Sequence, residues 1–273
     1  MSNRDLRRLI LLLLPAGLFF AAFFLLPMLR LFFIGGSGAT GWAAYASVVT
    51  DANYLRSLFA TLGVAAATTV ATLAISGISG VFLERYQFFG KSALVAMLTL
   101  PLAFPGVVIG FMVIMLAGRQ GLVGQVAMML GGERIVFAYS LAGLFMGYVY
   151  FSIPRTILTV MAAAEKLDPK LEEAARSLGA SPWRVVVDVI IPGLKPAFIS
   201  GGAICFATAV GAFGTAFTLA TRIDVLPMVI YTEFTLSANI AMAAALSFAL
   251  GVFTWIVLAL ARTAAGSTVA AAG

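Results

Sequence analysis

The sequence predicts an all-α membrane protein with six transmembrane helices and a polar two-helix segment, residues 165–196, between the fourth and fifth helices. Three observations support this fold class. Only 10% of the 273 residues are charged and 62% are hydrophobic, whereas soluble domains carry about a quarter charged residues. Apolar runs long enough to cross a bilayer recur along the chain. The charged residues concentrate instead in one stretch, which must lie in water.

The first three spans are expected at residues 9–34, 57–83 and 92–117. The first apolar run is too long for a signal peptide and is not followed by a small-x-small cleavage site. The second is rich in hydroxyl side chains, which favour helix packing over lining a solute path, although both roles are open. These residues are Thr61, Thr68, Thr69, Thr72 and Ser76. A glycine-rich loop with a short interfacial helix is expected at residues 118–134.

The last three spans are expected at residues 135–164, 197–221 and 240–261. The chain is treated as a single transmembrane domain. Eleven Lys and Arg residues lie in the segments assigned to one side of the membrane and four, including Arg222, in those assigned to the other. The positive-inside rule therefore places both termini and residues 165–196 in the cytoplasm.

Two spans contain helix-breaking residues in their interior. Leu100–Gly106 holds two prolines and a glycine, and residues 211–215 read Gly-Ala-Phe-Gly-Thr. Backbone groups freed in mid-membrane need protein or water as partners, and in transporters such breaks often lie at the solute path. A plain kink is the alternative at the prolines. The candidate path residues are Pro101, Phe104, Pro105, Gly211, Phe213 and Gly214.

The polar segment contains the signals for two short helices. Asp168-Pro169 is a cap followed by a first-turn proline, and Gly179 is suited to a left-handed helix end. Ser181-Pro182 repeats the start signal, and Pro192 is expected to end the second helix. Without further signals, an amphipathic surface helix that merely joins two spans would be the simplest interpretation.

The spacing within this segment is similar to a known motif. Glu173-Ala174-Ala175, then Gly179, then Val189-Ile190-Ile191-Pro192 resembles the EAA loop of permease subunits of binding-protein-dependent type I ABC importers. Val189 and Ile191 replace the Ile and Leu of the family pattern. Leu178–Pro182 and the chain length are most similar to the spermidine/putrescine-type branch.

The resemblance implies that the chain is a permease subunit of the bacterial inner membrane and not an enzyme. Its partners would be a second permease, two ATPase subunits and a periplasmic or lipid-anchored solute-binding protein. The residues carried over to contact with the ATPase are Glu172, Glu173, Ala174, Ala175, Gly179 and Pro192. The cargo is left open between polyamines and aminoalkylphosphonates.

The chain has no phosphate-binding loop of the GxxxxGK[ST] type, so ATP and Mg²⁺ are expected on the partner ATPase. It has no histidine and one cysteine, Cys205, which argues against a metal site and excludes an internal disulfide. The net charge of +6 is attributed to topology and not to nucleic acid. A secondary carrier or channel, and a membrane scaffold, are the alternatives in other functional classes.

Overall fold

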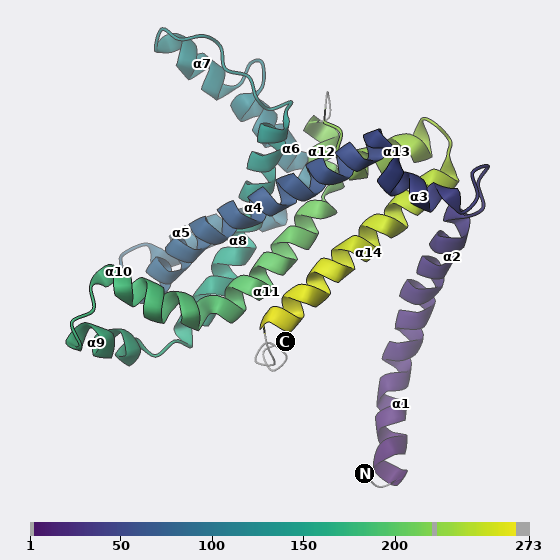
Figure 1. Cartoon of the computed structure of the whole chain (residues 1–273). Coiled ribbons are helices and arrows are strands. Elements are labelled where there is room, and N and C mark those ends of the chain that lie inside the picture. Colours follow the sequence, from purple (N-terminus) through teal and green to yellow (C-terminus); the bar gives the residue numbers. More distant parts are fainter. Residues whose placement is uncertain (1–2, 220–222, 266–273) are drawn as a thin grey trace. The chain divides into compact units, whose positions relative to one another are not determined.

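The computed structural model describes residues 3–219 and 223–265 (Figure 1). All regular secondary structure in these ranges is helical, which confirms the all-α prediction. Six helices in the described part are long and apolar enough to cross a bilayer, as predicted. They are Leu11–Gly35, Ala52–Arg85, Gly106–Met129, Leu141–Glu165, Pro182–Val210 and Ile240–Thr263. The third of these consists of two helices, Gly106–Ala117 and Leu122–Met129.

The chain divides into two compact units. Unit 1 comprises Met1–Arg56 and Val229–Val252, and unit 2 comprises Ser57–Met228 and Phe253–Gly273. Three helices, α4 (Ala52–Arg85), α13 (Leu226–Thr235) and α14 (Ile240–Ala265), contribute residues to both units. Unit 1 also contains α1 (Asn3–Phe20), α2 (Leu26–Gly35) and α3 (Ala43–Thr50).

Aromatic side chains hold unit 1 together. Phe32 of α2 lies against Trp42, Tyr45 and Phe248, with ring centroids 5.1 to 5.4 Å apart. The Tyr45 hydroxyl also donates a hydrogen bond of 2.8 Å to the Phe32 carbonyl. Residues 35–56, which join the first two predicted spans, are largely helical and packed, because their aromatic residues have a partner surface on α2 and α14.

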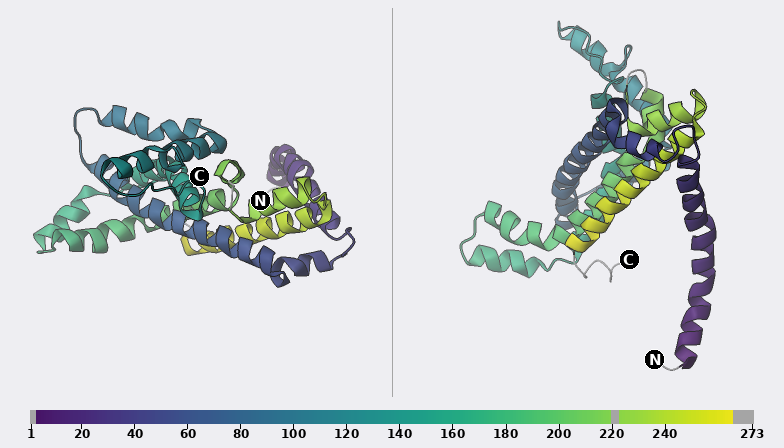
Figure 2. Two further views of the ribbon diagram at one scale, coloured as in Figure 1. Left: turned by 90° about the horizontal axis from the view of Figure 1, so that it is seen from above. Right: turned by 45° about the vertical axis from the view of Figure 1, so that its right-hand side comes forward.

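Unit 2 contains the remaining helices of the described residues, whose order is visible in Figure 1. They are α5 (Lys91–Thr99), a 3₁₀ turn (Leu100–Ala103), α6 (Gly106–Ala117), α7 (Leu122–Met129), α8 (Leu141–Glu165), α9 (Pro169–Ser177), α10 (Pro182–Val185), α11 (Ile191–Val210) and α12 (Phe213–Leu219). Within this unit, the α9–α10 hairpin projects from one end of the helices and α7 from the opposite end (Figure 2).

The core of unit 2 beside the α9–α10 hairpin is formed by α4, α8 and α11. Val160, Ala164 and Leu194 are essentially inaccessible to solvent. Gly80 of α4 allows a close approach, because a Cβ there would lie 2.8 Å from a methyl group of Val160. The hydroxyl residues of α4 face inward, and Thr68, Thr72 and Ser76 have no exposed surface. Their burial agrees with the packing role predicted for the second span.

Three predicted boundaries differ from the structure. The third span was expected at residues 92–117, whereas the candidate span of the structure is Gly106–Met129. The fourth transmembrane helix begins at Leu141, not near residue 135, because Ser140 caps it and the backbone N–H groups of Phe137 and Ala138 bond to the Ala117 carbonyl instead. The fifth does not begin at residue 197. It runs without interruption from Pro182 to Val210. The short helix expected within residues 118–134 is present as α7, and Arg222 lies outside the described residues.

Pro192 therefore does not end the second short helix. A π-helical turn, Val186–Ile190, precedes α11, and the helix continues through Pro192. A proline ring clashes with the carbonyl four residues earlier, here that of Asp188, and the wider π turn gives that carbonyl room. The same arrangement recurs at Pro27, which follows the π turn Ala21–Leu25.

Candidate functional site

The polar segment folds into the two helices that its sequence predicts. The Asp168 side chain accepts a hydrogen bond from the Lys170 backbone N–H at 3.0 Å, and Pro169 occupies the first helical position of α9. At the other end Gly179 has φ +85°. The N–H groups of Ala180 and Gly179 bond to the carbonyls of Ala175 and Arg176 at 3.0 and 2.9 Å. This pattern is a Schellman end, which requires a residue with positive φ at position 179.

The second helix starts as predicted. The Ser181 hydroxyl accepts a long hydrogen bond, 3.4 Å, from the Arg184 N–H, and Pro182 occupies the first helical position. The turn at Gly179 lets α10 run back beside α9. Because α10 continues through the π turn into α11, the hairpin is joined to a transmembrane helix without a flexible linker.

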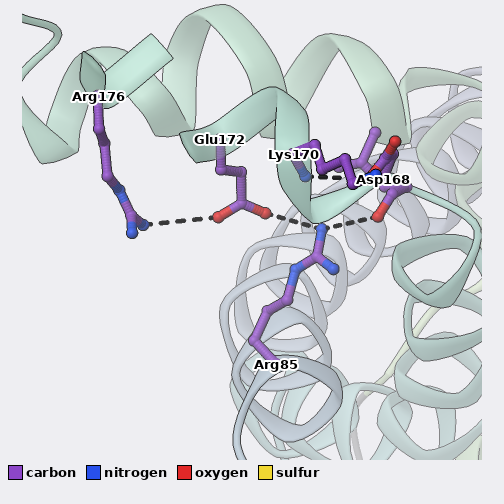
Figure 3. A network of polar contacts seen from close by, with 6 residues as sticks. Arg85, Asp168, Lys170, Glu172 and Arg176 are labelled. Atoms are coloured by element: carbon purple, nitrogen blue, oxygen red, sulfur yellow. Dashed lines mark hydrogen bonds and ion pairs between the residues drawn. The ribbon is translucent and has the colours of Figure 1, made fainter. Parts of the chain in front are cut away.

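A cluster of charged residues attaches the inner face of α9 to the C-terminal end of α4 (Figure 3). Nη2 of Arg85 lies 2.7 Å from Oε1 of Glu172 and donates a hydrogen bond of 3.1 Å to the Leu167 carbonyl. Nη2 of Arg176 lies 3.6 Å from Oε2 of Glu172. Glu172 is only 8% exposed. We call Arg85, Leu167 and Glu172 the α4–α9 clamp.

The outer face of α9 has the opposite character. Glu173 and Ala174 are exposed and make no tertiary side-chain bond in the described part of the chain. Leu171 and Leu178 are 52% and 89% exposed, and Trp183 of α10 is 72% exposed. Large apolar side chains at the water-facing end of a membrane protein are costly unless a partner covers them. The outer face therefore has the composition of a docking surface.

The residues predicted to contact the ATPase thus lie in three places: on the exposed side of the hairpin, on the inner face of α9 and at the start of α11. Glu173, Ala174 and the Gly179 turn lie on the exposed hairpin, whereas Glu172 points inward to Arg85. Pro192 lies beyond the π turn at the start of α11. Its neighbour Gly193 packs against Leu167, because a Cβ at position 193 would lie 2.6 Å from the leucine side chain. Pro192 is exposed but is not part of the outer face of α9.

The two predicted breaks are present and lie against each other. The 3₁₀ turn Leu100–Ala103 and the extended Phe104 interrupt the third span, and α11 ends at Gly211. The Thr215 hydroxyl donates to the Gly106 carbonyl at 2.9 Å, and the Tyr148 hydroxyl donates to the Ala212 carbonyl at 2.6 Å. The carbonyls of Gly106 and Ala212, next to the two breaks, thus accept hydrogen bonds from protein side chains.

Small residues make this contact close. A Cβ on Gly214 would lie 3.1 Å from the Val107 backbone nitrogen, and one on Gly110 would lie 2.5 Å from the Thr218 side chain. Among the candidate path residues, Pro101 is buried, Phe104 and Gly214 are partly buried, and Pro105, Gly211 and Phe213 are exposed. The breaks bring the two segments together and leave one side of each accessible.

Sequence reasoning missed the residues that support these features. Arg85 is one of the eleven Lys and Arg residues that were used above only to assign topology. Its position at the end of a span, on the same side of the membrane as the acidic residues of segment 165–196, indicates an ion pair. Tyr148 and Thr215 carry no local signal, because their partners are backbone carbonyls 64 and 109 residues away. Cys205 is buried. No cluster of His, Cys, Asp or Glu suited to a metal exists among the described residues.

Comparisons with known proteins agree with this architecture. Residues 76–265 match the family described as "Binding-protein-dependent transport system inner membrane component". The molybdenum transport system permease protein ModB of Escherichia coli K12 is 31% identical over 189 residues, which cover 68% of this chain and 81% of that protein. The sulfate transport system permease protein CysT of the same organism is 31% identical, covering 67% of this chain and 65% of CysT.

The fold is shared with a solved transporter. A chain of the bacterial alginate ABC transporter, crystallised in complex with an alginate pentasaccharide-bound periplasmic protein, superposes with a TM-score of 0.78. The two chains are 18% identical, and the match covers 94% of each. A carrier or channel that works without an ATPase is not favoured by these matches. The chain belongs to the binding-protein-dependent inner membrane component family and is a multi-pass permease subunit of a type I ABC importer.

Proposed function

We propose that the α9–α10 hairpin is the element through which partner ATPases drive this permease. The observation that carries the proposal is the outer face of α9, with exposed Leu171 and Leu178 beside Glu173 and the small Ala174. Small residues allow a partner surface to approach closely, the leucines supply apolar area, and Glu173 supplies a charge for a basic group. The ATPases bind ATP and Mg²⁺, and this chain hydrolyses none.

This role of the hairpin implies the orientation of the chain and the other subunits of the importer. The hairpin and both termini lie in the cytoplasm, in agreement with the distribution of Lys and Arg. A second permease completes the path, two ATPases bind the two hairpins, and a binding protein delivers the solute from the other side. Closure of the ATPases moves α9, and the α4–α9 clamp and the continuous α10–α11 helix transmit that movement to the spans.

A crosslinking experiment tests the docking role. A photoreactive amino acid at Leu178, 89% exposed on the hairpin, is expected to crosslink to the ATPase in the assembled complex. The matched control is Leu130, which is 83% exposed and follows α7 at the opposite end of unit 2. Crosslinking of the ATPase from Leu130 and not from Leu178 would reverse the proposed orientation.

We further propose that the solute is a small oxyanion. The polyamine expectation finds no support, because the similar permeases are named for molybdenum and sulfate transport. The test is uptake into proteoliposomes that hold the permease, its ATPases and its binding protein. Labelled molybdate or sulfate is expected to accumulate with ATP, whereas putrescine and 2-aminoethylphosphonate are not. Accumulation of putrescine alone would restore the original expectation.

The exposed sides of the two breaks are proposed to line the solute path. Pro105, Gly211 and Phe213 are accessible, whereas Thr68 and Thr72 of α4 are fully buried. In a Cys205→Ser background, single cysteines at positions 103–106 and 212–215 are expected to react with an impermeant thiol reagent. Their labelling should change when ATP is trapped. Labelling at positions 68, 69 and 72 instead would move the path to α4.

A further inference from the structure

Arg155 is a cation deep within a transmembrane helix. It lies 14 residues after Leu141 and 10 residues before Glu165, the ends of α8, or about 21 and 15 Å along the axis at 1.5 Å per residue. A charged side chain near the middle of a bilayer is costly if it faces lipid. A side chain about 15 Å from the helix end cannot reach the water beyond that end, so Arg155 needs water or a protein partner within the membrane.

The partners that Arg155 has within the chain are neutral. Its Nη1 donates a hydrogen bond of 3.3 Å to the Thr208 hydroxyl of α11, and its guanidinium carbon lies 5.9 Å from the centre of the Phe151 ring. Both contacts orient the guanidinium without compensating its charge. Among the described residues Arg155 forms no ion pair. The ion pairs found there join Glu172 to Arg85 and to Arg176.

The surroundings of Arg155 are polar for a membrane interior. Arg155 lies at a cavity of about 20 Å³ between α8 and α11, lined also by Ser152, Thr156, Thr159 and Thr208. This volume has room for about one water molecule, so it cannot enclose an oxyanion. Arg155 itself is exposed, so the residue is not enclosed within the cavity.

The contact between Arg155 and Thr208 lies near one of the helix breaks along the chain. Thr208, which holds the guanidinium, lies three residues before Gly211, and residues at this spacing share a helix face. Gly211 is the exposed end of α11 where the continuous helix stops. The Thr208 hydroxyl that Arg155 contacts therefore lies within one helical turn of the break.

We propose that Arg155 is an anion-contacting residue of the solute path, held in place by Thr208 and Phe151. This inference rests on the proposed function, because it requires an oxyanion as solute. A guanidinium offers paired N–H groups that match two oxygens of a tetrahedral anion. A single arginine with no fixed counter-ion gives a weak contact, which suits a site that a solute must leave as readily as it enters.

The test uses the complete reconstituted importer with labelled sulfate and molybdate as probes. Arg155→Gln is expected to lower uptake at least tenfold while ATP hydrolysis stimulated by the binding protein stays within twofold of wild type. Arg155→Lys, which keeps the charge, should lose less than threefold. The matched control is Arg262→Gln, which removes an exposed arginine of α14 outside the cavity and should transport normally.

A chemical rescue separates charge from size. In an Arg155→Cys, Cys205→Ala variant, a methanethiosulfonate that attaches a trimethylammonium group should restore at least a third of the wild-type uptake. The reagent that attaches a sulfonate should not. Equal rescue by both reagents, or no labelling in any nucleotide state, would overturn the proposal.

Two other results would also overturn it. Normal uptake by Arg155→Gln would show that the charge is not used, and loss of the second permease from the purified Arg155→Gln complex would assign Arg155 to a subunit interface. The proposed function fails separately, when the wild-type complex transports neither probe. In that case the anion assignment of Arg155 falls with it, although coupling through the α9–α10 hairpin stands.

Discussion

Glu172 and Glu173 are adjacent in the sequence but lie on different faces of α9. Glu172 is buried against Arg85 and ties the helix to α4, whereas Glu173 is exposed and has no ion-pair partner among the described residues. A helix turns about 100° per residue, so the two consecutive carboxylates point in different directions. The inner face therefore determines where α9 lies, and the outer face is left to contact a partner.

The largest effect is expected from reversing the charge of the outer face. Glu173→Lys should lower ATP-driven uptake at least tenfold, because it places a cation where the ATPase surface offers a basic group. The amount of protein in the membrane and its melting temperature should not change, since exposed substitutions cost the fold little. Uptake and thermal unfolding of the same preparation give both values. Normal uptake would remove Glu173 from the docking surface.

The inner face should respond in the opposite way. Glu172→Gln removes a carboxylate that is 8% exposed and leaves Arg85 without its counter-ion. We expect a loss of about 1.5–3 kcal/mol, the range for a hydrogen bond to a charged group, and a lower melting temperature. Glu173→Gln is the matched control, with the same chemistry one residue away. If both variants melt at the same temperature, the α4–α9 clamp does not stabilise the protein.

A smaller effect is expected at the turn that sets the direction of both faces. Gly179 has φ +85°, and a β-branched valine there costs about 1–3 kcal/mol of strain. Ser181→Ala removes only a long capping bond of 3.4 Å, a loss at the low end of capping effects, about 0.5 kcal/mol. Thermal unfolding of Gly179→Val and Ser181→Ala should rank in that order. The reverse order would contradict the Schellman end.

The smallest effect should come from the edge of the cluster. Arg176 lies 3.6 Å from Glu172, and its side chain is 62% exposed. Exposed ion pairs contribute about 0–1 kcal/mol, so Arg176→Ala should change the melting temperature far less than Arg85→Ala. High salt should weaken the Arg176 contribution further. Similar losses in both arginine variants would show that Glu172 depends equally on its two partners.

The local signals of the hairpin were readable from the sequence because each acts within a few residues. Asp168, Ser181 and Gly179 all do what their residue types predict. Pro192 shows the limit of such signals. A proline usually ends a helix, but the π turn before it relieves the clash, and that turn carries no sequence mark. The helix that follows the turn, α11, packs against α8, and local reasoning cannot evaluate that packing.

By itself the sequence determined the fold class, the number of spans, the charged hairpin and the position of the two breaks. Hydrophobicity, charge and backbone restriction are properties of short segments, so they can be read without a structure. Only the tertiary structure decided which of two adjacent glutamates faces inward, that the two breaks pack together, and that Arg155 meets Thr208. These contacts join residues 53 to 109 positions apart, and their geometry depends on how whole helices pack.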